Sequence, residues 1–227
     1  MNMRIWLLAA VFWAILIISI SAGIVSAGSK APRCTGPDAC TGNTGTVAFG
    51  SCNGDSACFS NTAPIAPDSC DDVAACFANH GPIAPGSCSG GYSACNSNSG
   101  AVGPGSCIGL VACVVNSAAV GPGSCLGEAT CDTNSGPVGP GSCTGGDSAC
   151  NSNTGSVGSK SCNGAAACDG NSGSVGAISC NGQDACVNNT ASVGTDSCNG
   201  NEACSCNTTP IGSGQCNGAF KCYNCGT

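Results

Sequence analysis

Small, polar and aliphatic residues recur along this chain with a period of 18 residues, which lengthens to 19 in two copies. Each copy opens with cysteines spaced C-x5-C or C-x6-C, and the consensus continues as x-x-N-[S/T]-G-x-[V/I]-G-x-x-S. The copies hold several Gly and no 3.6-residue hydrophobic period, which argues against helical repeats. A unit with one aliphatic residue and two cysteines cannot bury a core alone, so the pattern predicts that successive copies stack.

The predicted fold class is all-β, a parallel β-solenoid (β-helix) of about eleven 18-residue coils with disulfides inside the coils. Like residues would then form files along the stack. The Val/Ile file is expected to form the apolar core, and the Asn file is expected to form an amide ladder at a turn. The Gly after Val/Ile is expected to relax the backbone at a corner. Coils about 4.8 Å apart predict a rod of about 50 Å.

Cysteine is unusually abundant, with 24 in 227 residues. This density is typical of a disulfide scaffold in an oxidising compartment. Bonds within each pair are favoured because N-G-x-x-A is turn chemistry and because both long copies insert their extra residue between the two cysteines. The expected pairs are Cys34 with Cys40, Cys52 with Cys58, Cys70 with Cys76, Cys88 with Cys95, Cys107 with Cys113, Cys125 with Cys131, Cys143 with Cys150, Cys162 with Cys168, Cys180 with Cys186, Cys198 with Cys204, Cys216 with Cys222, and Cys206 with Cys225.

Two other uses of the cysteines stay open from sequence alone. Disulfides between stacked cysteines of neighbouring coils are compatible with the permitted Cα separation. A zinc site is the alternative at the C-terminus, where Cys204-Ser-Cys206 and Cys222-Tyr-Asn-Cys225 supply four thiols at suitable spacing.

The N-terminus predicts the compartment and the domain boundaries. Residues 1–27 contain Arg4, a long apolar run and then Val-Ser-Ala, as in a secretory signal peptide. The run is long enough for an uncleaved membrane anchor, which is the alternative. Residues 28–33 form a short linker, and 34–227 form the repeat region of ten full coils and a truncated one. The expected localisation is secreted, extracellular or at the cell surface.

Several function classes are disfavoured by the charged residues. Five Lys and Arg against twelve Asp and Glu provide no basic surface for nucleic acid. The single His, His80, occupies a column otherwise filled by Ser or Thr, and the carboxylates are scattered, with Asp71-Asp72 the one adjacent pair. We therefore expect no enzyme, no catalytic residue, no resident metal and no cofactor. Calcium bound to the acidic arcs is a less favoured alternative.

A candidate binding face follows the conserved column of Asn residues. If each Asn points inward, the residues just before and just after it would point outward as two parallel files. The file after Asn is uncharged and mostly hydroxylic, and such a grid can organise water in an ice-like lattice. The simpler interpretation is that Ser and Thr suit a narrow turn and bond to backbone. The candidate face comprises Thr44, Thr62, Ser99, Ser117, Ser135, Thr154, Ser172, Thr190 and Thr208.

The repeats resemble three groups of known proteins. The segment Val157-Gly158-x-x-Ser161-Cys162 looks like the hexapeptide rule of left-handed parallel β-helices, which also use 18 residues per coil. The C-x5-C pairs resemble those of beetle hyperactive antifreeze proteins, secreted solenoids with a disulfide inside every coil, although their Thr-Cys-Thr array is absent here. The SCNGxxAC-type copies also resemble repeats of secreted microbial and algal proteins with no assigned activity.

The function expected from these features is that of a non-enzymatic extracellular structural, surface or adhesive element. The alternative is an ice-binding protein that uses the Ser/Thr face. The expected partner is an extracellular surface, a matrix or ice, and the membrane is a partner only if the N-terminal segment is uncleaved.

Overall fold

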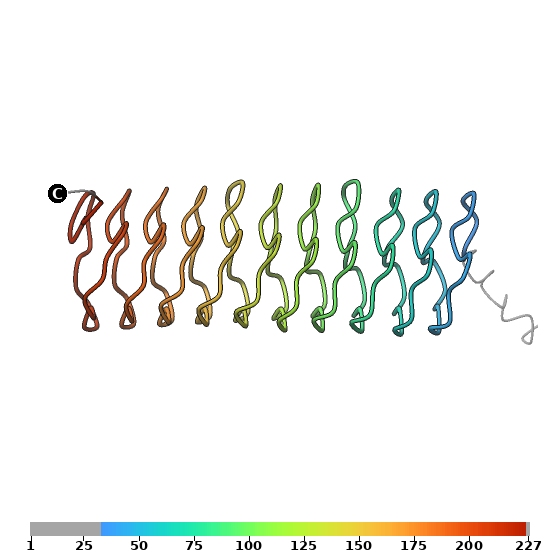
Figure 1. Cartoon of the computed structure of the whole chain (residues 1–227), viewed down its shortest axis with the longest axis horizontal. Helices are drawn as coiled ribbons and strands as arrows, with labels where there is room; N and C mark the ends of the chain where they lie inside the picture. The colour runs from blue at the N-terminus through green and yellow to red at the C-terminus, as the bar shows by residue number, and fades with distance from the viewer. Residues whose placement is uncertain (1–32, 226–227) are drawn as a thin grey trace, which may run out of the picture. The chain divides into compact units, whose positions relative to one another are not determined.

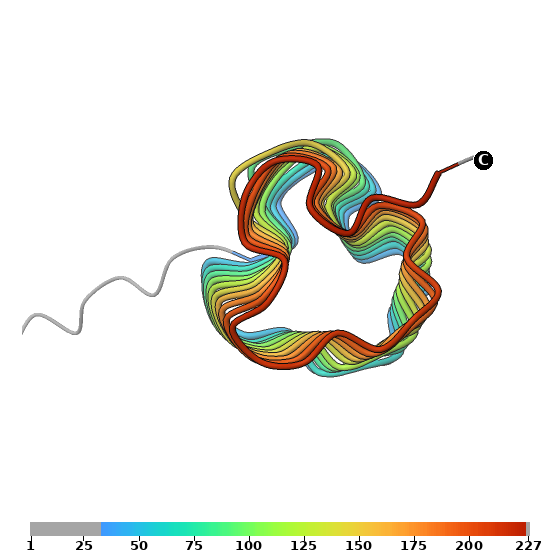
Figure 2. The same ribbon diagram turned by 90° about the vertical axis from the view of Figure 1, so that its left-hand side faces the viewer.

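The structure is a computed structural model that describes residues 33–225. The repeats follow one another side by side as successive coils (Figure 1). Viewed along the stack, the coils superimpose on a two-lobed outline, so that equivalent residues of neighbouring coils lie over one another (Figure 2). The predicted signal peptide, residues 1–27, and the linker up to residue 32 lie outside the described residues.

Secondary structure in the described part consists of turns, bends and isolated parallel bridges, with no helix and no named strand. The bridges connect the Val/Ile file from one coil to the next, from Val47↔Ile65 through to Val193↔Ile211. A second, shorter series connects Ile108, Leu126 and Thr144. Because single bridges are shorter than a strand, the β-solenoid class stays a prediction, whereas the stacking of parallel coils is observed.

Left-handed backbone explains why pairing is confined to single bridges. In the coil that starts at Cys52, positive φ angles occur at Cys52, Ser56, Ser60 and Asp68, and the equivalent residues of the other full coils share this conformation. Each of these positions turns the chain sharply, and the segment between Ser60 and Asp68 is the longest stretch of the coil without a positive φ. The sequence-based placement of a corner at the Gly directly after Val/Ile is wrong, because the positive φ lies two residues further along, as at Gly50.

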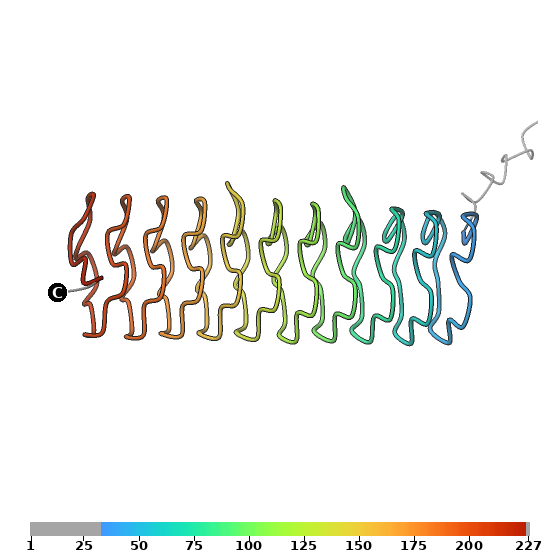
Figure 3. The same ribbon diagram turned by 45° about the horizontal axis from the view of Figure 1, so that its top comes forward.

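Twelve disulfides link all 24 cysteines in the pairs that the sequence favours. The in-coil bonds join Cα atoms 5.5–5.8 Å apart. The two long coils bulge outward at the arc between their cysteines (Figures 1 and 3). The sulfur atoms, the Ala before the second cysteine of most coils, and the Val/Ile file form one continuous core.

The Asn file forms the predicted amide ladder. Asn134 donates from Nδ2 to Asn116 Oδ1 at 2.8 Å and to the Gly136 carbonyl at 2.8 Å, and its Oδ1 accepts from Asn153 Nδ2 at 2.9 Å. The same bonds recur from Asn61 onward, and these Asn side chains are fully buried in the central coils. Each Asn therefore joins two coils and also satisfies the carbonyl two residues further along in its own coil.

A Ser file forms a second ladder at the residue before each first cysteine. Ser69, for example, accepts at Oγ from the Ser87 N–H at 3.2 Å and donates to the Ala84 carbonyl at 3.0 Å. No buried side-chain N or O atom of the described residues lacks a hydrogen-bond partner. The polar side chains buried beside the apolar core are thus satisfied, which is the condition for burying such groups without a large penalty.

In the last full coil, the side chains of two residues take the place of contacts that the ladders make elsewhere. Thr209 takes the column that is Gly or Ala in the other coils, and it donates from N and Oγ1 to Asn207 Oδ1, which has no further Asn to accept from. Gln215 takes the Ser column and accepts the Gly212 N–H at Oε1, 3.1 Å away. These two departures from the consensus supply partners that a next coil provides elsewhere.

Candidate functional face

The extended segment of each coil alternates buried and exposed residues. From Asn61 to Ile65 the order is buried, exposed, buried, exposed, buried, and the same order holds with small variations in the other full coils. The exposed residues form two files, which together we call the outer face. The first is the predicted Ser/Thr file. The second lies two residues further along the chain and comprises Thr46, Pro64, Pro82, Ala101, Ala119, Pro137, Ser156, Ser174, Ser192 and Pro210.

The structure exposes every predicted residue of the candidate face. Nine hydroxyl residues and His80 fill the ten positions of the first file, all of them exposed. Thr62 Oγ1 bonds to His80 Nδ1 at 2.7 Å, and Thr190 Oγ1 donates to the Asn207 carbonyl at a long 3.5 Å. The other seven hydroxyls make no hydrogen bond to any residue between 33 and 225. The interpretation that these hydroxyls serve to bond backbone therefore fails at most positions.

The spacing of the outer face is regular because the backbone holds it. The N–H of each residue in the first file donates to the Asn carbonyl of the next coil at 2.8–2.9 Å, from Thr44 through to Thr190. Such ladders space neighbouring chains about 4.8 Å apart, and residues two apart on extended backbone lie about 6.7 Å apart. None of the positions in either file is Asp, Glu, Lys or Arg. The outer face is thus an uncharged grid on a fixed backbone.

One part of the predicted face is wrong. The file just before Asn is predicted to lie beside the Ser/Thr file on one strand, but those residues have positive φ in all ten full coils, between 50° at Ala78 and 70° at Gly42. They end the preceding turn and do not belong to the extended segment. The second file of the outer face occurs in its place, and the sequence signal for it was the hydroxyl pair in Thr44-Gly-Thr46, Thr154-Gly-Ser156 and Ser172-Gly-Ser174.

The other candidate groups are dispersed. Asp71 Oδ1 accepts from Asn53 in the preceding coil, at 3.2 Å from the backbone N and 3.1 Å from Nδ2. Asp72 Oδ2 accepts the Gly90 and Gly91 N–H groups of the following coil. The adjacent carboxylates thus connect coils in opposite directions and do not form an acid–base pair.

Three carboxyl groups have a raised pKa. Partial burial raises the pKa of Asp71 above 3.8, although the hydrogen bonds from Asn53 act in the opposite direction. Burial also raises the pKa of Asp132, against a backbone hydrogen bond from Thr133. The pKa of Asp169 is raised chiefly by burial and additionally by the charge of Asp184. All three carboxyls therefore bind protons more readily in the folded chain than in the unfolded chain.

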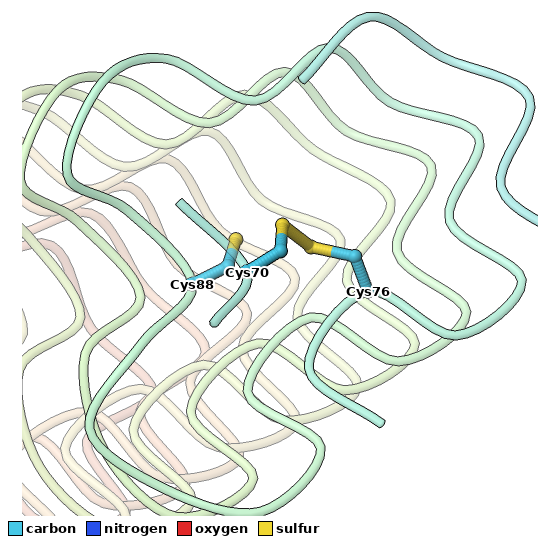
Figure 4. A group of neighbouring side chains, drawn as sticks. All are labelled: Cys70, Cys76 and Cys88. Atoms are coloured by element: carbon cyan, nitrogen blue, oxygen red, sulfur yellow. A yellow bond between two sulfur atoms is a disulfide. The ribbon is translucent and has the colours of Figure 1, made fainter. Parts of the chain in front are cut away.

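Cysteine sulfurs are the ligand atoms that come close enough together to suggest metal binding in the described residues. Three such groups exist, and in the group of Cys70, Cys76 and Cys88 all the sulfurs lie within 4.8 Å of one another (Figure 4). Each of these sulfurs is in a disulfide, as Figure 4 shows for Cys70 and Cys76. A bonded sulfur is no thiolate and does not ligate zinc in the usual way. The C-terminal zinc alternative is also wrong, because all four of its cysteines are in disulfides.

Comparison with known families assigns the chain. Residues 19–130 and 141–226 match the family described as Domain of unknown function (DUF7640). The chain belongs to this family. The match takes in nearly the whole repeat region and most of both files of the outer face. No curated protein and no solved structure matches the chain.

Membership of the DUF7640 family assigns no activity. The evidence for a function therefore lies in the chemistry of the outer face. The disulfide density is typical of extracellular proteins. A search of the described residues for an apolar helix of membrane-spanning length finds none.

Proposed function

We propose that this chain is a non-enzymatic extracellular structural element, a disulfide-crossed parallel β-solenoid that adheres to a surface or matrix through its outer face. The observation that supports this proposal best is the outer face itself, two exposed uncharged files on a backbone whose ladder bonds vary by only 0.1 Å, from 2.8 to 2.9 Å. A face of this kind needs no rearrangement to contact another flat surface, so little conformational entropy is lost on binding.

The interior supports the same proposal. The cysteines are in disulfides, and buried polar side chains in the described part have partners. The candidate acid and base groups are held in separate hydrogen bonds, as for Asp71, Asp72 and His80. A stiff stack with one repeated face is the construction expected of a scaffold, because every coil adds the same contacts.

Adsorption of the oxidised full chain to an uncharged hydroxylic solid, cellulose or chitin particles, tests this function. We expect depletion from solution at constant ionic strength, and loss of adsorption in the double variant Thr154→Asp and Ser172→Asp, which places two carboxylates on the outer face. The matched control is Gln183→Asp, an exposed arc position whose column already holds Asp55 in another coil. Absence of adsorption, or equal loss in the control, would refute adhesion through the outer face.

Ice binding is the second candidate, and the seven hydroxyls without protein partners favour it specifically. Free hydroxyls at regular spacings can hold water in fixed positions. The oxidised protein should then show thermal hysteresis and shape ice crystals, and Thr154→Tyr should abolish both because the larger ring protrudes from the grid. Gln183→Tyr is the control, since Tyr92 occupies the same column. Absence of hysteresis in the unaltered chain would remove this candidate and leave adhesion standing.

A further inference from the structure

A hollow of about 390 Å³ lies on the arcs of three consecutive coils. None of the residues that line it belongs to the outer face. Asp55 of the Cys52 coil, Val73 and Phe77 of the Cys70 coil, and Tyr92 and Asn96 of the Cys88 coil line it. The Cys88 coil is one of the two long coils, and its arc stands out beyond those of its neighbours (Figure 3). The extra residue in this arc therefore gives the hollow a raised wall.

Two aromatic rings form the apolar part of the hollow. Phe77 stacks on Phe59 of the preceding coil with ring centroids 5.1 Å apart and an interplanar angle of 5°. The stack fixes the Phe77 ring, which is half-buried. Tyr92 is 57 % exposed, so most of its ring remains available to a ligand. Concave sites with aromatic walls and a few polar groups are typical of small-molecule binding.

The charge around the hollow has one sign. Asp55 lines it, and Asp68, Asp71 and Asp72 belong to the same coils. The sequence contains no Lys or Arg between Arg33 and Lys160. A Ser56 hydroxyl donates to Asp55 Oδ1 at 3.0 Å, while no hydrogen bond within residues 33–225 uses Asp55 Oδ2. Negative potential beside exposed π faces attracts an organic cation in preference to an anion or a neutral apolar group.

We propose that this hollow binds a small organic cation carrying a methylated ammonium group. The methyl groups would contact the Phe77 and Tyr92 rings, whose faces are electron-rich, and the Asp55 carboxylate would balance the charge. Asn96 would orient a polar substituent of the ligand through its amide. A bare metal ion fits the hollow poorly, because Asp55 is its only carboxylate-bearing wall residue. This site is independent of the outer face and of the function proposed for it.

The test titrates the full oxidised chain with choline and, separately, with its neutral isostere 3,3-dimethylbutan-1-ol. Amide resonances are followed by two-dimensional NMR at constant ionic strength. For choline we expect saturable shifts confined to residues 55–56, 73–77 and 92–96, with a Kd on the order of millimolar for so open a site. The isostere should bind at least about fivefold more weakly because it lacks the charge. Equal binding of the two compounds, shifts spread over all acidic arcs, or no saturable shift would overturn the proposal.

Three variants each remove one ring or one charge from the hollow. Two of them use a residue that another coil has at the equivalent position, so that the fold is kept. Phe77→Val copies Val114, Tyr92→Leu copies Leu110, and Asp55→Asn removes only the charge. Each should weaken choline binding about two- to fivefold. Glu128→Gln is the matched control, a carboxylate in the Asp55 column with no aromatic ring in its neighbouring coils, and it should leave the Kd unchanged. An unchanged Kd in all three hollow variants, with native spectra, would also overturn the proposal.

Discussion

The in-coil disulfides stiffen each coil but do not connect one coil to the next. They join residues six or seven apart, and only Cys206–Cys225, which is 19 residues apart, links neighbouring coils. Cohesion along the stack therefore rests on the Asn and Ser ladders, the backbone bonds and the Val/Ile file. We predict that replacing one central Asn lowers the free energy of unfolding by more than the small size of its side chain suggests.

The perturbation is Asn134→Ala. It leaves the Asn116 Oδ1 and the Gly136 carbonyl without a partner, and it removes one of the two bonds of Asn153 Nδ2, which keeps its bond to the Gly155 carbonyl. All lie in a region of the stack where Asn side chains are fully buried. An unpaired buried acceptor or N–H costs about 1–3 kcal/mol, so the two orphaned acceptors and the one unpaired N–H of Asn153 give roughly 3–9 kcal/mol before relaxation. Because backbone shifts and entering water recover part of this, we expect a loss of about 3–5 kcal/mol in the free energy of unfolding.

Guanidinium unfolding with the disulfides intact, followed by circular dichroism, measures this loss. The midpoint should fall by about 1 M, given slopes of a few kcal/mol per molar. Hydrogen exchange should accelerate in the coils on both sides of residue 134 and not at the ends of the stack. The control Ser135→Ala removes an exposed hydroxyl without a partner and should change stability by less than about 0.5 kcal/mol. Equal midpoints and equal exchange in the two variants would refute the argument that the amide ladder holds the coils together.

Three further outcomes are expected. The double variant Cys206→Ser and Cys225→Ser should accelerate hydrogen exchange in the C-terminal turn alone, because this disulfide closes the end of the stack; faster exchange in the central coils would contradict this. Ile178→Gly should raise the free energy of unfolding by about 1 kcal/mol, and the thermal midpoint with it, since Ile178 is 50 % exposed at a φ of 57° that favours Gly; a lower midpoint would show that packing outweighs strain. The free energy of unfolding should rise as the pH falls through the raised pKa values of Asp132 and Asp169 toward their unfolded value of 3.8, because the folded state binds more protons in that window. The double variant Asp132→Asn and Asp169→Asn should flatten this rise. An unaltered pH profile of the melting temperature in that variant would contradict the prediction.

Sequence reasoning predicted the repeat, the inward files and the disulfide partners. The Asn, Val/Ile and Ser columns recur at a fixed interval, and only stacking lets such sparse units bury a core. The insertions in the arcs of Cys88 and Cys143 pointed to in-coil bonds, because an outward arc tolerates an extra residue while a packed segment does not.

The two files of the outer face and the hollow were only partly foreseeable. The Ser/Thr file follows from one inward Asn, but its partner file was assigned to the wrong side of that Asn. Non-glycine residues such as Ser60 and Val115 adopt left-handed backbone there, which composition does not signal. The hollow combines Asp55, Phe77 and Tyr92, which are ordinary arc residues in the sequence and become neighbours only through stacking.

The sequence by itself determined the period, and it favoured the inward columns and the cysteine pairs that the structure has, because these depend on recurrence along one chain. The sign of φ at each turn decided which residues face outward, and the contacts between coils decided which columns meet at a hollow. The contacts of Thr209 and Gln215 belong to the same class, since these two departures acquire meaning only where the following residues have Cys225 in place of the Asn of the ladder. These properties arise from packing between residues about 18 apart, which only the tertiary structure specifies.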